Sequence, residues 1–148
     1  MIAALAIALC LIWSGAGAKS VTNLDYTAMQ RGKQIAKSCY ENYKDSISEQ
    51  YLCLSQAGLA IGSDNFAYLG FAYYSFIMEA GAEEGLRDSK TYAVRLKQRA
   101  RESAKKHYDA LVYFQRKFFV RIDDLCEILR SNCAMANRLA KYWQDHNH

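Results

Sequence analysis

Apolar residues recur every three or four positions between residues 111 and 129, and this stretch has the densest helical pattern in the chain. The predicted face consists of Leu111, Phe114, Phe118, Ile122, Leu125 and Leu129. Cys126 lies beside the last turn of that face. We therefore predict a helix over about 108–130, with the other helices built around it and a disulfide from Cys126 holding it in place.

The same spacing predicts helices on either side of this stretch. One spans about 23–43, and another starts at 47 after the capping box Ser46-x-x-Glu49. Residues 64–80 are apolar nearly all round, which is typical of a central helix, although a helix half covered by a partner would also fit. A loop is expected over 81–85.

Two more helices complete the pattern. The first is expected over 89–104, with a break near Ser103–His107 where the apolar periodicity lapses. The last begins after Ser131-Asn132, which can cap it. The chain has no proline, and its last glycine is Gly85. The predicted fold class is therefore all-α, a disulfide-linked bundle of five to six helices.

The first 18 residues are expected to be a signal peptide. They contain no charged side chain, and an apolar run over 2–13 is followed by the A-x-A-like site Ala16-Gly17-Ala18. That run is shorter than the roughly 20 apolar residues of a membrane span; an uncleaved N-terminal anchor is the alternative. The sequence thus predicts a single helical domain over 19–148 that is secreted or periplasmic, without stable membrane insertion after signal removal.

Four cysteines remain in that domain: Cys39, Cys53, Cys126 and Cys133. An even number behind a secretion signal predicts two disulfides, and their spacing does not match a zinc site. We favour links from Cys39 and Cys53 to Cys126 and Cys133, with Cys53–Cys126 as the leading pair, because cross-links that close long loops stabilise a fold most. The alternative, Cys39–Cys53 with Cys126–Cys133, would close two local hairpins.

Residues suited to catalysis are sparse, so no catalytic residue, metal ligand or cofactor is predicted and the chain is not expected to be an enzyme. His107 lies in the basic run 105–107 and is expected on the solvated surface; His146 and His148 lie in the polar tail. The acidic residues Asp123, Asp124 and Glu127 are likewise expected on a solvated helix face.

Residues 87–121 carry eleven Lys/Arg against three Asp/Glu, a net charge of +8. This indicates a solvated basic face, an acidic protein partner or an anionic envelope surface. Nucleic acid is not the expected partner of a secreted chain.

Several short segments resemble a known family. They are Asn42-Tyr43-Lys44-Asp45, then Cys53-Leu54, an aromatic-rich middle helix, Leu125-Cys126 with Ser131, and Lys141-Tyr142. Their order and spacing are similar to those of the immunity proteins that bacteria keep against type VI secretion amidase effectors. The resemblance implies a small periplasmic helical protein that blocks the catalytic cleft of a cell-wall amidase. Members of that family are often dimeric, so a homodimer is a further expectation. The family's Asp-Leu-Tyr-His is replaced here by residues 127–130, and Cys39 and Cys133 are additional.

An inhibitor of this kind needs an element that enters the hydrolase. The predicted loop at 81–89 is the candidate, with Glu83 and Glu84 for charge complementarity and Leu86 as an apolar anchor. The alternative function is a secreted helical carrier of a small apolar ligand, lined by the aromatic helix. The two differ in whether that helix faces an internal cavity or an exposed patch.

Overall fold

The computed structural model describes residues 24–86 and 94–146, and these ranges form six helices without a strand. The helices are α2 (Tyr26–Asn42), α3 (Ile47–Ile61), α4 (Phe66–Leu86), α5 (Val94–Phe118), α6 (Ile122–Ile128) and α7 (Cys133–His146). The all-α fold class is thus confirmed. The predicted signal peptide (residues 1–18) and His148 lie outside the described residues, as does the side chain of His146. Within those ranges, no helix is long and apolar enough to cross a membrane.

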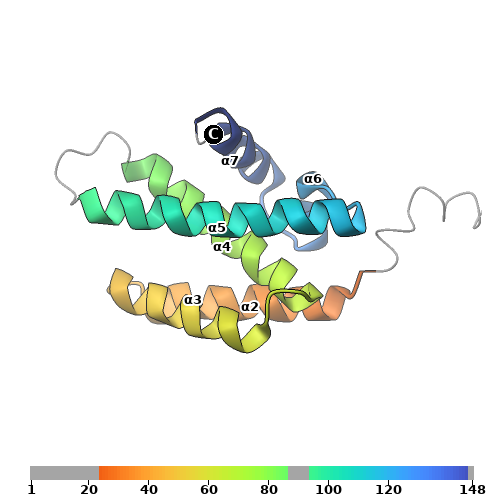
Figure 1. The fold of residues 1–148 in the computed structure, drawn as a ribbon, viewed down its shortest axis with the longest axis horizontal. Helices are drawn as coiled ribbons and strands as arrows, with labels where there is room; N and C mark the ends of the chain where they lie inside the picture. Colours follow the sequence, from red (N-terminus) through yellow and green to blue (C-terminus); the bar gives the residue numbers. More distant parts are fainter. Residues whose placement is uncertain (1–23, 87–93, 147–148) are drawn as a thin grey trace, which may run out of the picture.

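Helix α4 is the centre of the bundle (Figure 1). It crosses obliquely behind α5, with α2 and α3 on one side and α6 and α7 on the other. Its aromatic side chains Tyr68, Phe71, Tyr73 and Phe76 are almost completely buried. The expected core role of this aromatic stretch is therefore confirmed. Phe76 packs against Tyr108 and Trp143, with ring centroids 5.4 and 6.1 Å away, so other rings surround it.

Two glycines let α2 and α4 cross with their backbones in contact. A Cβ atom placed on Gly32 would lie 1.7 Å from the carbonyl oxygen of Ala67, and one on Gly70 would lie 1.9 Å from that of Met29. No larger residue fits either position unless the helices move apart. This crossing fixes α2 against the centre of the bundle.

Helix α5 is continuous through Ser103–His107, so the predicted break there is wrong. Its buried face comprises Ala100, Ala104, His107, Leu111 and Phe114, in steps of four and three residues. The apolar pattern is interrupted only when alanine and histidine are not counted as core residues. Because His107 occupies a core position, the pattern runs through the supposed gap.

The predicted helix over 108–130 is also wrong, because the chain turns between α5 and α6. Phe119 has a positive φ of 57°, and Arg121 is the N-cap of α6. Asp123 and Asp124 occupy the first turn of α6, where carboxylates favour the positive end of the helix dipole. Leu125 and Leu129 are buried nevertheless, so the apolar spacing persisted across a break in the helix.

The disulfides join Cys39 to Cys53 and Cys126 to Cys133, so the favoured cross-chain pairing is wrong. Each bond closes one helical hairpin, α2–α3 or α6–α7, with Cα atoms 5.6 and 5.1 Å apart. Helix α4 lies between the two hairpins, which keeps their cysteines from meeting. A disulfide that closes a long loop would stabilise the fold more, but it can form only where the two Cα atoms lie within about 7 Å.

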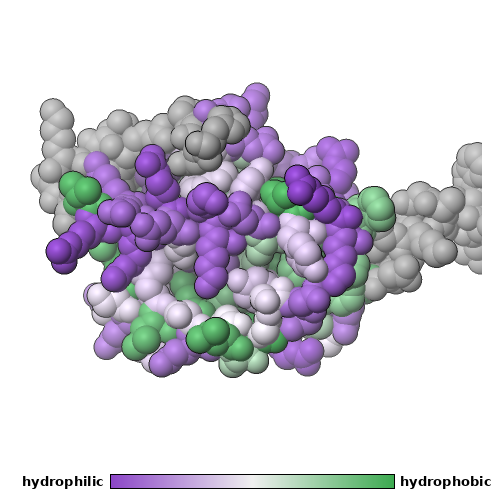
Figure 2. All heavy atoms as spheres, viewed as in Figure 1, coloured by the Kyte–Doolittle hydropathy of each residue, from purple (hydrophilic) through white to green (hydrophobic). Residues whose placement is uncertain are grey.

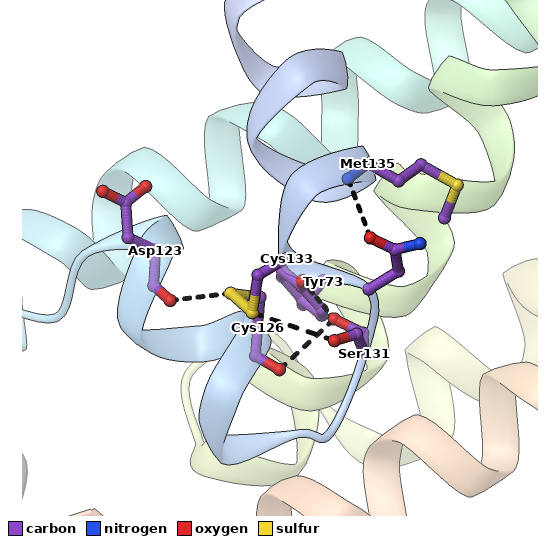
Figure 3. Close-up of a disulfide and its surroundings, with 7 residues drawn as sticks. Tyr73, Asp123, Cys126, Ser131, Cys133 and Met135 are labelled. Atoms are coloured by element: carbon purple, nitrogen blue, oxygen red, sulfur yellow. Dashed lines mark hydrogen bonds between the residues drawn. A yellow bond between two sulfur atoms is a disulfide. The ribbon is translucent and has the colours of Figure 1, made fainter.

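The second hairpin is tied to the rest of the bundle at its turn (Figure 3). The hydroxyls of Tyr73 and Ser131 form a 2.6 Å hydrogen bond beside the Cys126–Cys133 bond. The side-chain amide of Gln30 donates to the carbonyl of Ile128 over 3.1 Å. These contacts from α4 and α2 place α6 and α7 without a continuous helix from α5.

The predicted caps at Ser46 and Asn132 are confirmed. The backbone N–H of Glu49 donates to the Ser46 hydroxyl over 3.4 Å, and that of Met135 donates to the Asn132 side chain over 3.1 Å. Helix α3 ends at its C-cap, Gly62, whose φ of 84° favours glycine.

Candidate functional site: a groove between α3 and α5

Helix α3 exposes large apolar side chains among polar ones on its outer face. Leu54 is its one buried residue and Glu49 its one charged residue. Leu59 is 83% exposed and Leu52 is 57% exposed, and their seven-residue spacing places them on the same side of the helix. The Cys39–Cys53 bond holds α3 to α2, so this face is presented by a fixed element. Exposed apolar helix faces of this kind mark interaction surfaces.

Helix α5 presents a row of basic side chains beside α3. Arg99 and Lys106, both exposed, line the recess between α5 and α3, whereas Arg101 pairs with Glu83 of α4. Figure 2 shows hydrophilic side chains as a band across the molecule, with recessed pale and green surface below it and apolar side chains along the edge formed by α3. A cationic surface and an apolar surface therefore lie side by side.

The recess between the two helices is an open groove of about 250 Å³. Its floor includes Tyr68 and Phe71 of α4, and Gly58 of α3 leaves space above Phe71. The two walls are bridged at one end by Arg99, whose guanidinium lies 5.5 Å from the centre of the Tyr51 ring. A second contact joins them just beyond the other end of α3, where Tyr113 and Lys117 of α5 hydrogen-bond to Asp64.

Asp64 is that second bridge. Its carboxylate accepts hydrogen bonds from Lys117, at 2.8 Å, and from the hydroxyl of Tyr113, at 3.1 Å. The bond from Lys117 is the main reason that the pKa of Asp64 is lowered from its ordinary value. These surface bonds set the spacing of α3 and α5 where α3 ends.

A buried polar network lies beneath the groove. The Tyr40 hydroxyl donates to one carboxylate oxygen of Glu79 over 2.8 Å, and the other oxygen is 2.8 Å from Nδ1 of His107. Glu79 is 2% exposed and His107 is 4% exposed, so the expectation that His107 is solvated is wrong. Burial, followed by the charge of Glu79, raises the pKa of the Tyr40 hydroxyl far above its ordinary value.

The network gives His107 a defined orientation. Nδ1 and the Glu79 carboxyl group share a hydrogen bond, which holds the ring in place. The imidazole also meets the Phe71 ring edge-on, with centroids 5.8 Å apart, and lines the groove. His107 therefore contributes to the groove floor in a fixed orientation.

The residues predicted to contact a partner lie elsewhere and not in a loop. Glu83 and Glu84 belong to α4, which continues to Leu86, so the predicted loop over 81–85 is wrong. Glu83 is 5% exposed and lies 3.9 Å from the Arg101 guanidinium, whereas Glu84 pairs with Arg138 at 2.6 Å. The side chain of Leu86 lies outside the described residues. Glu83 and Glu84 therefore do not form an exposed loop tip.

The groove itself was not predicted, although parts of its signal are in the sequence. The near absence of charge from residues 47–61, combined with leucines off the buried stripe, indicates an exposed apolar face. His107 lies three and four residues from Ala104 and Leu111, the spacing of the buried face of α5. Comparison with protein-family models, curated proteins and solved structures found no match for this chain.

Proposed function

We propose that this protein acts outside the cytoplasm by binding another protein through the α3 face. The observation that carries the proposal is the exposure of Leu52 and Leu59 on a helix fixed by a disulfide. Disulfides persist in oxidising compartments, which supports an extracytoplasmic site of action. A rigid, preformed surface lowers the entropic cost of binding.

The chemistry of the surface defines the partner that it fits. An apolar strip on α3 runs beside the basic row of α5, so the partner requires an apolar patch with an acidic rim. The charges favour fast, oriented association, and the leucines supply the buried contact area.

The resemblance to immunity proteins supplies the class of partner. A cell-wall amidase whose catalytic cleft is covered by α3 would be inhibited by occlusion, without chemistry by this chain. In this proposal α3, instead of the segment around Glu83 and Glu84, makes the principal contact, because Glu83 is buried. The secreted-carrier alternative stays a prediction; the aromatic helix expected to line its cavity packs against other rings.

The test is inhibition of purified type VI amidase effectors, measured as peptide release from purified cell wall. The wild-type chain should inhibit stoichiometrically. Leu59→Glu should weaken binding about thirtyfold, since hot-spot losses are about 2 kcal/mol or more. Met135→Glu is the matched control, because it adds the same charge to a partly exposed apolar position of α7.

The two variants distinguish α3 from α7 as the contact surface. Full inhibition by the Met135→Glu protein and weak inhibition by the Leu59→Glu protein supports the proposal. Equal inhibition by both variants excludes α3 as the contact surface, and absence of inhibition by the wild-type chain refutes the amidase as partner.

A further inference from the structure

We propose that the groove between α3 and α5 binds a small amphipathic carboxylate, with its apolar part on the α4 floor and its charged group at the α5 wall. This inference does not depend on the identity of a protein partner. It rests on the size of the groove, the nature of its lining and the orientation of His107.

The size and floor of the groove suit a short apolar chain or a single ring. At roughly 30 Å³ per water molecule, 250 Å³ corresponds to about eight waters, which is the size of a ligand with eight to ten non-hydrogen atoms. Leu54, Tyr68 and Phe71 supply apolar and aromatic surface for it. Ligand sites typically combine such a lining with a few placed polar groups.

The polar groups of the groove favour an anion. Arg99 and Lys106 lie on the α5 wall, and Ser103 adds a hydroxyl between them. An arginine can hold a carboxylate through two parallel hydrogen bonds. Glu102 also lines the groove, but its carboxylate accepts a hydrogen bond from Gln98 over 3.0 Å, and the two cations outnumber it.

His107 adds an imidazole ring to the floor of the groove. Because Glu79 engages Nδ1, the imidazole cannot rotate freely, and the ring lines the groove in a fixed orientation. Burying a glutamate and a histidine beneath a groove carries a desolvation cost. A site that uses the imidazole gives this pair a role beyond packing.

The probe is octanoate, which has ten non-hydrogen atoms and one carboxylate. Binding to the full chain with both disulfides intact is measured by calorimetry and by amide chemical shifts. The ligand efficiency of small molecules predicts a dissociation constant on the order of 0.1–1 mM. Octan-1-ol, which has the same chain without the charge, should bind at least tenfold more weakly.

Gly58→Leu provides a variant that fills the groove. A Cβ atom at Gly58 would lie 3.5 Å from the Phe71 ring, an ordinary contact, and the helix gains from losing a glycine. This variant should lose octanoate binding at least tenfold. Gly85→Leu is the matched control, because a Cβ there meets nothing within 4 Å and the position is outside the groove.

A second pair of variants tests the charge. Lys106→Ala should weaken octanoate binding about fivefold, whereas Lys105→Ala, one residue earlier and paired with Asp109 at 2.8 Å, should leave it unchanged. The inference is overturned if octanoate does not bind, if octan-1-ol binds equally well, or if Gly58→Leu protein binds octanoate like wild type. Loss confined to the Gly58→Leu and Lys106→Ala proteins supports it.

Discussion

Replacing Gly70 with alanine tests the contact on which the bundle is built. The new Cβ would lie 1.9 Å from the Met29 carbonyl oxygen, whereas ordinary contacts begin at 3.4 Å, so the two backbones must separate by about 1.5 Å. Overpacking of this kind costs about 1–3 kcal/mol or more, and here backbone, not a flexible side chain, must move. Separation also loosens the packing around Met29 and Phe71, which are fully buried.

The higher helix propensity of alanine opposes this destabilisation, and its contribution is smaller. Alanine in place of glycine favours a helix by about 1 kcal/mol. Because backbone atoms must move, we place the overpacking cost at about 3 kcal/mol, and we expect Gly70→Ala to lower the free energy of unfolding by about 2 kcal/mol net. For a domain of this size, the melting temperature should fall by about 10 °C.

Gly85→Ala is the matched control on the same helix. Its Cβ would meet nothing within 4 Å, so only the propensity gain applies and the melting temperature should rise by a few degrees. Thermal and denaturant unfolding of the three proteins gives the comparison. If Gly70→Ala protein is as stable as wild type, α2 and α4 do not cross as described.

Further predictions concern the buried polar groups and the disulfides. His107→Leu leaves one carboxylate oxygen of Glu79 buried without its hydrogen-bond partner, although the other keeps the Tyr40 hydroxyl, and should lower the free energy of unfolding by about 1–3 kcal/mol; a loss below about 0.5 kcal/mol would contradict the buried position of His107. Burial raises the pKa of Tyr51 to about 12, and also raises that of Tyr73. Because these pKa values exceed the unfolded value near 10, the associated stability is present below pH 10 and is lost as the pH rises towards 12. In an ultraviolet titration, the tyrosines of the native protein should therefore ionise at higher pH than those of the protein in urea. Coincident titration curves would contradict this prediction. Cys39→Ser/Cys53→Ser should lower stability by about 3 kcal/mol and Cys126→Ser/Cys133→Ser by slightly less, since the closed loops span 14 and 7 residues; equal melting with and without reductant would contradict this.

Local chemistry was the most predictable part of this fold. The caps at Ser46 and Asn132, the stop at Gly62 and the central aromatic helix follow from propensity and periodicity, which depend on neighbours in sequence. These features define the fold class and most helix starts before any tertiary contact is known.

Tertiary effects account for the errors. His107 is polar yet occupies a core position, because Glu79 from another helix pairs with it. The apolar spacing of residues 111–129 continues across the turn at Phe119, because α5 and α6 both face the same core. Disulfide pairing could not be chosen from loop length, since it depends on α4 lying between the two hairpins.

The groove was missed for a related reason. An exposed face on α3 is recognised only when the buried stripe is known, and the groove forms from helices that are distant in sequence. The acidic residues Glu83 and Glu84 were assigned to a loop because Gly81 and Gly85 flank them. The helix continues through both glycines and directs Glu83 towards α5.

Amide hydrogen exchange of the protein, alone and in complex with an amidase that it is found to inhibit, tests the proposed binding surface most directly. The proposal predicts slower exchange in the complex over α3 (Ile47–Ile61) and the first half of α5, with α7 unchanged. Slower exchange confined to residues 81–86 would instead place the contact at the segment of Glu83 and Glu84. Unchanged exchange throughout the chain would contradict binding altogether.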